Sequence, residues 1–421
     1  MTEQTAAADW PALYDRLNAV TMVYGPPRPD GSVVEVAESF GEPSFGGGYE
    51  AEYAAIRQRV GVMHLPQRGV LRLTGADVKD YLHRLCTQEI NGLTGGQTVR
   101  AFQLDEKGRI AADLIVHHGD EDTWLEGDVF DLPWVAELIE KRLFTEDVTL
   151  EDLTDRKQVL WLLGPAAVRL LGETAGEAQA ERAAAVGSLA GTHHVLDLPL
   201  NGGRSAHVTA YRQDLGDMLG VRLVVPSGDA IEVYGALLTR SGYEVGGDEA
   251  ADAEYAARRR ASMRGRPVGW SAFNTVRVEE GVPWYHVDFG RDSLPAEVPG
   301  PHGYESAVSF TKGCYLGQEV VARMKSLGHP KKLLVGLRLE DEHGGGLPVA
   351  GSHVVEPGDP AKVIGGVTSS TAAPLRGQAA IAFAVVRWGQ HRPGTGVAVL
   401  VEGRPVAAEV TRLDELLAGA G

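Results

Sequence analysis

The chain has 421 residues, of which 43% are apolar and 23% charged, and its formal net charge is −17. This length and composition allow a sizeable core in two or three domains and exclude wholesale disorder. The negative charge repels polyanions, so DNA and anionic membranes are disfavoured as partners. No apolar run approaches the ~20 residues of a membrane-spanning helix. The first residues also lack the pattern of a secretory signal, so we expect a cytoplasmic protein.

The N-terminal part of the sequence alternates helical patterns with glycine- and proline-rich stretches. Apolar residues at helical spacing predict a helix over residues 1–25, and we expect residues 1–45 to form a helical extension and linker. A second helix is predicted over 49–63, followed by a strand over 69–75 and a helix over 76–90. Residues 102–118 (FQLDEKGRIAADLIVHH) form two apolar segments around a turn, which predicts a β-hairpin.

The rest of the chain divides into a mixed region and a β-rich end. Strands and helices follow one another up to about residue 330 without a regular βαβ rhythm, so we expect an α+β fold for residues 46–330. An Ala-, Arg- and acid-rich stretch at about 247–266 is predicted to be an inserted, solvent-facing helix. Short alternating strands between Gly/Pro turns predict a small β-barrel domain over 331–421.

Two cysteines are present, Cys86 and Cys314, which are too few for a disulfide framework or a structural zinc site. Cys86 falls on the apolar face of the predicted helix over 76–90, so we expect it in the core. Cys314 lies in KGCYLGQEVVAR, residues 312–323, between two glycines that allow a tight loop and close approach of a ligand. The alternatives for this cysteine are a reactive thiol and an incidental residue ahead of a helix.

The neighbours of Cys314 offer ligand-binding groups. Lys312 and Arg323 supply positive charge that would favour a thiolate. Gln318 and Glu319 would either hydrogen-bond a ligand or begin the helix QEVVARM.

Two further segments carry candidate site residues. Asp113 interrupts an apolar strand of the predicted hairpin, so it faces either solvent or a cavity in which it needs a partner. In residues 274–297, Arg277 and Glu279 alternate with valines, which predicts a strand with both charges on one face. The aromatic pair Trp284-Tyr285 and then Asp288 follow. Aromatic residues beside such an Arg–carboxylate pair suit a flat heteroaromatic ligand, because the aromatic wall stacks while polar groups bind the ring edge.

The fingerprints of the common cofactor enzymes are missing. The sequence has no G-x-G-x-x-G after a strand, no Walker loop, no H-E-x-x-H and no G-x-S-x-G. A dehydrogenase, NTPase, zinc protease or α/β-hydrolase is therefore disfavoured.

The order of the motifs resembles one superfamily over roughly residues 48–415. A G-x-I-x-x-D-L hairpin is followed by L-G-P, N-T-x-R-x-E-x-G-x-P, K-G-C-Y-x-G-Q-E and a C-terminal β module. This order is similar to that of the glycine-cleavage T-protein (GcvT, aminomethyltransferase) superfamily. The cysteine motif resembles its YgfZ-type folate-binding branch, in which the cysteine-bearing loop is diagnostic, so the resemblance favours a functional Cys314.

The resemblance implies a fold and a cofactor. The fold would have three domains around a central cavity that holds tetrahydrofolate, with α+β N-terminal parts and a C-terminal β-barrel. Asp113 would approach the reacting folate nitrogens, and Arg277, Tyr285 and Asp288 would lie in the pterin region. Lys312, Gln318 and Glu319 of the cysteine loop complete the predicted cofactor-binding set, and Asp113 and Cys314 are the predicted catalytic residues.

One departure from the family bears on the activity. Aminomethyltransferases carry a glutamate that binds the pterin amino and ring N–H groups, whereas Arg222 occupies the corresponding position here. Because an arginine cannot accept those hydrogen bonds, standard pterin recognition and aminomethyl transfer are both in question.

Two main functions remain open. The first is a YgfZ-like, tetrahydrofolate-binding accessory protein that supports iron–sulfur cluster assembly or repair through Cys314, with iron–sulfur client or assembly proteins as partners. The second is a tetrahydrofolate-dependent aminomethyltransferase or demethylase in which Asp113 activates a folate nitrogen. A folate-domain protein without a catalytic role is a third possibility.

Overall fold

The computed structural model describes residues 9–28, 30–41, 48–243, 264–326, 328–340 and 346–417. The chain forms two compact units. One comprises Met1–Val78, Leu93–Val99 and Ile115–Phe273, and the other comprises Lys79–Gly92, Arg100–Leu114 and Asn274–Gly421. Most of the predicted insertion at 247–266 lies outside the described residues. No described helix is both long and apolar enough to cross a membrane.

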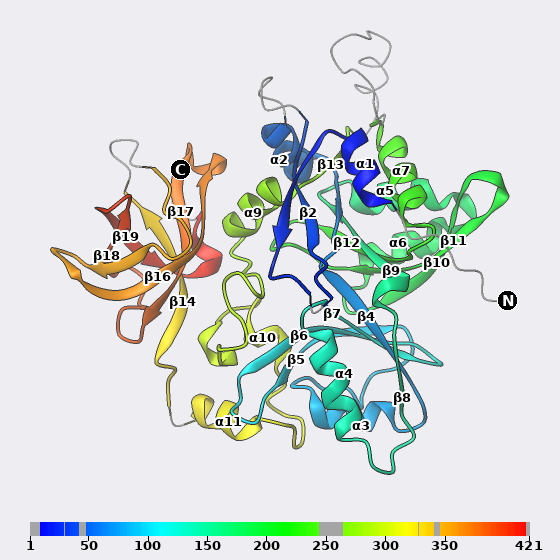
Figure 1. The fold of residues 1–421 in the computed structure, drawn as a ribbon, viewed down its shortest axis with the longest axis horizontal. Coiled ribbons are helices and arrows are strands. Elements are labelled where there is room, and N and C mark those ends of the chain that lie inside the picture. Colours follow the sequence, from blue (N-terminus) through cyan, green and yellow to red (C-terminus); the bar gives the residue numbers. More distant parts are fainter. Residues whose placement is uncertain are drawn as a thin grey trace, which may run out of the picture. The chain divides into compact units, whose positions relative to one another are not determined.

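A six-stranded sheet forms the centre of the first unit (Figure 1). Its strands lie in the order β10-β11-β12-β9-β3-β13, and all pair antiparallel except β13, which pairs parallel with β3. The strand bounds are β3 Gly61–His64, β9 Lys157–Leu163, β10 His193–Pro199, β11 Ser205–Arg212, β12 Gly220–Pro226 and β13 Arg266–Pro267.

Three helices share a core with this sheet: α5 (Ala167–Ala175), α6 (Ala180–Ser188) and α7 (Ala230–Ser241). Their apolar residues lie at helical spacing and pack against alternate residues of the strands, so each helix buries one stripe. The helix α7 ends where Gly242 adopts a left-handed conformation with φ 89°, which glycine takes without a steric penalty.

The N-terminal segment differs from the predicted long helix. A short helix, α1 (Trp10–Arg16), is followed by β1 (Ala19–Tyr24), which pairs antiparallel with β2 (Val34–Phe40). The residues AVTMVY are rich in β-branched side chains, which favour a strand once a partner is present. The helix over 49–63 was also predicted too long, because α2 (Gly48–Gln58) ends before β3.

A five-stranded sheet has the order β5-β6-β7-β4-β8. Its strands β5 and β6 form the predicted hairpin, and the chain passes from one compact unit to the other within both strands. The bounds are β4 Arg68–Thr74, β5 Gln97–Leu104, β6 Ile110–His118, β7 Thr123–Asp128 and β8 Thr149–Asp152, with helices α3 Val78–Leu85 and α4 Leu132–Lys141.

The C-terminal strands close into a six-stranded barrel, in the order β14-β17-β16-β15-β18-β19 (Figure 1). Its interior is an apolar core of alternate strand residues. The predicted α+β fold with a C-terminal β-barrel is therefore confirmed. The bounds are β14 Lys332–Leu339, β15 His353–Glu356, β16 Asp359–Ala373, β17 Ala379–Arg387, β18 Gly396–Val401 and β19 Arg404–Thr411.

Three helices precede the barrel: α9 (Trp270–Glu279), α10 (Tyr304–Ala307) and α11 (Gln318–Ser326). The predicted strand around Arg277 was wrong, because residues 274–279 belong to α9. Residues 275–279 of this helix are all buried, so the alternation of valines with charged residues did not mark one exposed face.

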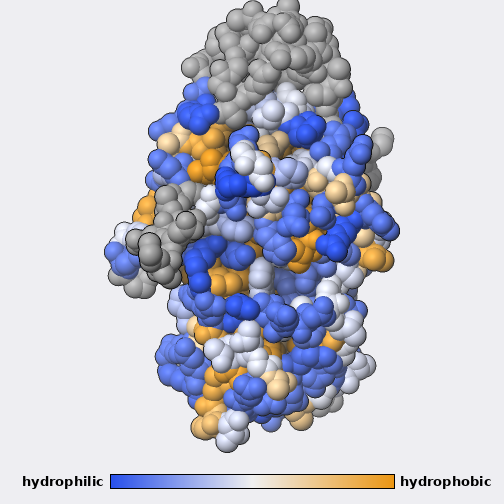
Figure 2. Space-filling view, turned by 90° about the vertical axis from the view of Figure 1, so that its right-hand side faces the viewer, coloured by the Kyte–Doolittle hydropathy of each residue, from blue (hydrophilic) through white to orange (hydrophobic). Residues whose placement is uncertain are grey.

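On the face shown in Figure 2, hydrophilic side chains are interspersed with small hydrophobic patches. Scattered apolar residues of this kind are normal on a protein surface and do not by themselves indicate an interface.

Candidate functional site

The β5–β6 hairpin presents Asp113. A tight turn joins the strands, in which Asp105 Oδ1 accepts hydrogen bonds from the backbone N–H of Lys107 and Arg109, both at 2.8 Å. Asp113 follows the buried Ala112 on β6, and 15% of its side chain is exposed. Its carboxylate is therefore neither fully solvated nor sealed in the core.

Arg100 on the neighbouring strand β5 binds Asp113 through two parallel hydrogen bonds. Nε donates to Oδ1 at 2.9 Å and Nη2 donates to Oδ2 at 2.7 Å. Arg100 is therefore the partner expected for an acid in an apolar strand, although it was not predicted from the sequence. Arg100 precedes the hairpin predicted over 102–118, so no local pattern paired it with Asp113.

The cysteine loop is held by Lys312. Its ammonium donates to the carbonyl oxygens of His83, Cys86 (2.6 Å) and Gln88 (3.0 Å), at and beyond the end of α3. Burial lowers the pKa of Lys312 to about 8. These bonds commit the ammonium to the backbone, so its predicted contact with a ligand remains a prediction.

Cys314 is exposed, whereas Cys86 is buried, as predicted. Burial raises the pKa of the Cys86 thiol to about 12. The two thiols therefore occupy opposite environments, and Cys314 is the accessible one.

The helix α11 begins at Gln318, whose Oε1 accepts a hydrogen bond from the N–H of Tyr315 at 3.1 Å. Glu319 is exposed in the first turn. Gly317 has φ +80° and lies so close to the hairpin turn that an added Cβ would be 2.9 Å from the Asp105 carbonyl oxygen. The cysteine loop thus packs on the turn of the hairpin that carries Asp113.

Arg277 and Asp288 form a buried ion pair, with Nη1 and Oδ2 2.6 Å apart and both side chains fully inaccessible. Ser369 of β16 accepts from Arg277 and donates to Asp288, each at 2.6 Å. Asp288 also accepts from the Trp284 N–H and the Thr368 hydroxyl. These bonds attach the segment after α9 to the barrel, and a direct contact of either residue with a ligand remains a prediction.

Tyr285, on this same segment, contacts the hairpin. Its hydroxyl donates to the Ile110 carbonyl at 3.2 Å, and its ring meets Phe289 edge to face at 5.3 Å between centroids. The structure therefore brings Tyr285, the cysteine loop and Asp113 to one hairpin, and it places Arg277 and Asp288 against the barrel. A cavity shared by Asp113 and Cys314 remains a prediction.

Arg222 belongs to a buried charged cluster in the first unit. It donates to Glu126 at 2.9 Å, and Arg68 donates to the same carboxylate at 3.0 Å. The hydroxyl of Tyr211 donates to its other oxygen at 2.5 Å, and the Arg222 guanidinium lies 4.3 Å from the Trp161 ring centroid. The positive charge at position 222 is therefore neutralised by an acid that the sequence analysis missed.

Glu126 is fully buried, yet it remains ionised. Burial alone would raise its pKa, but the charges of Arg68 and Arg222 and the imidazole of His117, whose Nε2 lies 3.7 Å from Oε2, outweigh burial and hold the pKa well below its usual range. Because Glu126 is fully buried and its carboxylate is held by Arg68, Arg222 and Tyr211, it is not accessible to a ligand.

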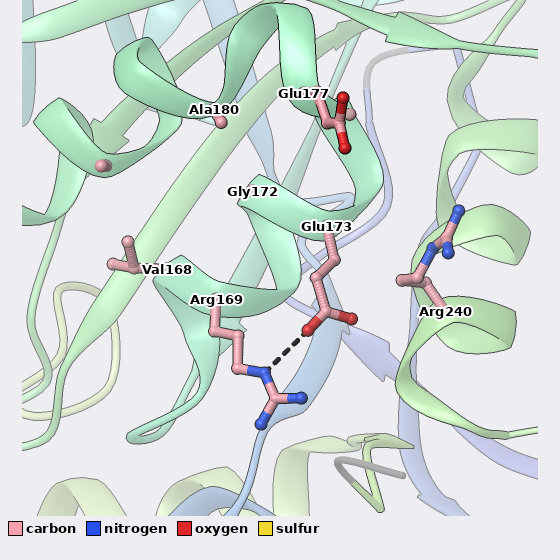
Figure 3. Close-up of a pocket in the computed structure, with 9 residues that line it drawn as sticks. Val168, Arg169, Gly172, Glu173, Glu177, Ala180 and Arg240 are labelled. Carbon is pink, nitrogen blue, oxygen red and sulfur yellow. Dashed lines mark hydrogen bonds and ion pairs between the residues drawn. The ribbon is translucent and has the colours of Figure 1, made fainter.

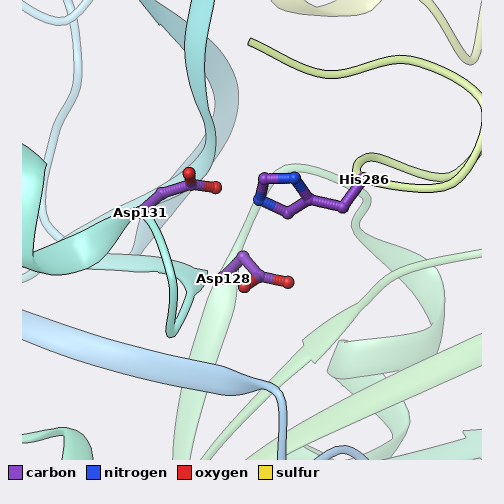
Figure 4. A group of neighbouring side chains, drawn as sticks. All are labelled: Asp128, Asp131 and His286. Carbon is purple, nitrogen blue, oxygen red and sulfur yellow. The ribbon is translucent and has the colours of Figure 1, made fainter. Parts of the chain in front are cut away.

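Two other polar groups of the first unit have structural roles. Asp128 and Asp131 lie at the junction of β7 and α4 (Figure 4), where Asp128 accepts from the Tyr24 hydroxyl and the Phe130 N–H.

Arg169 and Glu173 line a shallow hollow of about 580 Å³ and form a surface ion pair one turn apart on α5 (Figure 3).

Family models match most of the chain. Residues 30–244 match the GCVT N-terminal domain, and residues 332–414 match the glycine cleavage T-protein C-terminal barrel domain. The second match coincides with the six-stranded barrel.

Relatives extend over nearly the full length. An aminomethyltransferase of Chlorobium chlorochromatii is 26% identical over 85% of this chain and 87% of its own, and one of Exiguobacterium sibiricum is 29% identical over 85% and 86%. The crystal structure of the glycine cleavage system aminomethyltransferase T from Bartonella henselae superposes with a TM-score of 0.74 at 19% identity, covering 96% of both chains. The overall fold is thus shared with that structure.

Proposed function

Because the chain belongs to the glycine cleavage T-protein family, we propose that it binds tetrahydrofolate, with Asp113 contacting the ligand from the β5–β6 hairpin. The observation that carries this proposal is the partly exposed carboxylate of Asp113, held in one orientation by Arg100. Each carboxylate oxygen has a second lone pair, so Asp113 can accept a hydrogen bond from a ligand N–H without losing Arg100.

The other predicted residues fit the ligand to different degrees. Tyr285 supplies an aromatic ring beside the hairpin. Arg277 and Asp288 would act indirectly, because they fix the segment that carries Tyr285 to the barrel. Gln318 and Glu319 begin α11, and Glu319 is the more accessible of the two.

Tetrahydrofolate supplies the nitrogen atoms that carry a one-carbon unit. The contribution of the chain would be to orient the ligand and to place the negative charge of Asp113 beside a nitrogen that becomes positive, which stabilises that charge where water is partly excluded.

The exposed Cys314 supports the accessory role in iron–sulfur cluster assembly or repair. A thiol on a loop pinned by Lys312 is accessible to a partner protein or a cluster. Since Cys86 is buried, one chain offers a single accessible thiol, and a cluster needs further ligands. Those ligands would come from an iron–sulfur client or assembly protein.

A second candidate is an aminomethyltransferase, and the names of the full-length relatives favour it more than the accessory role. The buried Arg222–Glu126 pair argues against standard pterin recognition, because an arginine has no acceptor and the carboxylate of Glu126 is fully buried. Asp113 serves equally in both candidates.

The two candidates are separated by matched variants. An accessory protein requires Cys314, so in cells lacking this chain Cys314→Ser would fail to restore iron–sulfur enzyme activity, whereas Cys86→Ser would restore it. An aminomethyltransferase would form methylenetetrahydrofolate from an aminomethyl donor in vitro, releasing ammonia and the donor's carrier group, with or without Cys314. Turnover that survives Cys314→Ser and is lost in Asp113→Asn would reject the accessory role.

A further inference from the structure

We propose that Arg100 is a positioning residue that orients Asp113 and joins it to the segment leading into the cysteine loop. This inference rests on the proposed function, in which Asp113 contacts the folate. It adds the residue that sets this contact and a physical connection between the two predicted catalytic residues.

The first part of the argument is the geometry of the pair. The planar guanidinium of Arg100 binds both oxygens of Asp113, at 2.9 and 2.7 Å, and the two side chains are only 19% and 15% exposed. A bidentate pair of this kind fixes the plane of the carboxylate as well as its position. The free lone pairs of Asp113 therefore point in defined directions.

The second part is the remaining nitrogen of Arg100. Nη1 donates to the carbonyl oxygen of His302 at 2.7 Å and to the hydroxyl of Ser306 at 3.2 Å. One guanidinium thus joins the hairpin to the turn that begins α10. A lysine could not make this set of contacts, because its ammonium is a single point without the fork of donors.

The third part is a run of hydrogen bonds from that turn toward the cysteine. The carbonyl of Ser306 accepts from Gln88 Nε2 at 3.1 Å, and that of Ala307 accepts from the Thr87 hydroxyl at 2.6 Å. The N–H of Ser309 donates back to the Thr87 carbonyl at 2.9 Å.

Lys312 closes this run. Its N–H donates to the Ser309 hydroxyl at 3.2 Å, and its ammonium binds the carbonyls of Cys86 and Gln88. Hydrogen bonds therefore connect Asp113, through Arg100 and the residues after α3, to a position two residues before Cys314. A ligand that reduces the mobility of Asp113 will therefore also reduce the mobility of residues 302–312 and slow their hydrogen exchange.

The test compares Arg100→Gln and Arg100→Lys with the native chain. The matched control is Arg109→Gln, which removes an exposed arginine from the same hairpin. Tetrahydrofolate affinity is measured by calorimetry, and backbone hydrogen exchange of residues 302–312 is measured by mass spectrometry with and without tetrahydrofolate. The barrel, residues 332–411, serves as the internal reference.

In Arg100→Gln we expect about tenfold weaker binding and about tenfold faster exchange in 302–312, because charge-assisted hydrogen bonds are lost. Arg100→Lys keeps the charge without the fork, so we expect an affinity between those of the native chain and Arg100→Gln, with no recovery of the protection. Tetrahydrofolate protects 302–312 in the native chain and not in Arg100→Gln. Arg109→Gln behaves as the native chain.

A hydrogen-exchange rate of residues 302–312 in Arg100→Gln that equals the native rate would overturn the proposal. An equal increase of the exchange rate in the barrel would also overturn it, because it indicates global destabilisation. If the native chain binds no tetrahydrofolate, the proposed function fails. The exchange rates without ligand then still decide whether Arg100 anchors the segment.

Discussion

Most of the charged side chains in the sequence motifs form hydrogen bonds or ion pairs within the chain. Lys312 holds backbone carbonyls, Arg277 holds Asp288, and Arg222 holds Glu126. Asp113 and Cys314 differ, because each keeps an accessible reactive atom. At the scale of single residues, both predicted catalytic residues are therefore accessible.

The thiols provide a direct test of this division. With iodoacetamide at pH 8, we expect Cys314 to be alkylated at least about tenfold faster than Cys86, because the Cys86 thiol is buried and its pKa is raised to about 12. Peptide mass spectrometry of the native protein measures both rates. Equal, slow labelling would mean that Cys314 is protected and would remove the argument for a reactive loop.

The buried cluster around Glu126 makes a prediction about stability. Arg222→Glu places a second carboxylate beside Glu126, and we expect it to lower the free energy of unfolding by about 3–5 kcal/mol. The control is Arg169→Glu, which reverses an exposed charge in the surface pair with Glu173 (Figure 3) and should cost at most about 1 kcal/mol. Urea denaturation measures the free energy of unfolding of both variants. A value for Arg222→Glu equal to that of the native chain would show that the cluster is not a buried charge pair.

At the scale of elements, buried polar groups fasten segments that are distant in sequence. Glu52 of α2 accepts the N–H of Phe40, at the end of β2, at 2.6 Å and the N–H of Gly269, just before α9, at 2.8 Å. Ser369 of β16 does the same for the segment after α9. Within each unit, side-chain contacts of this kind position segments that are distant in sequence.

The environment of Glu52 predicts a pH dependence. Burial raises its pKa from 4.5 to about 7, although the two backbone N–H groups oppose this shift. Between these values the folded state binds more protons than the unfolded state, so this group stabilises the fold as the pH falls from about 7 toward 4.5. The full contribution is of the order of 3 kcal/mol.

Glu52→Gln removes that titration. We expect the difference in unfolding free energy between native and variant to change across this pH window, which urea denaturation at pH 5, 6, 7 and 8 measures. A difference that stays constant across the series would show that Glu52 does not titrate there.

For the whole molecule, the elements with a clear period were predictable from sequence. The hairpin over 102–118 shows two apolar segments around a turn, and the strands of the barrel alternate between apolar and polar residues and are separated by Gly/Pro turns, so their type followed from local pattern. The helix α9 was missed because it is buried along residues 275–279, and β1 was missed because the helical spacing of apolar residues in α1 was extended into it.

The site was predictable only in part. Asp113 and Cys314 stood out because each breaks its local pattern. Arg100 and Glu126 did not, because their roles depend on partners brought close by folding: Glu126 meets Arg222 across 96 positions of sequence. The roles of such side chains can be predicted only when the pairing of the strands is known.

The central claim is that the chain binds tetrahydrofolate through Asp113, and calorimetric titration of the purified protein tests it most directly. The comparison is native protein, Asp113→Asn and Glu106→Gln, the last removing an exposed acid from the turn of the same hairpin. We predict binding by the native chain and Glu106→Gln, and at least about tenfold weaker binding by a folded Asp113→Asn. No binding by the native chain, or unchanged affinity in Asp113→Asn, would contradict the account.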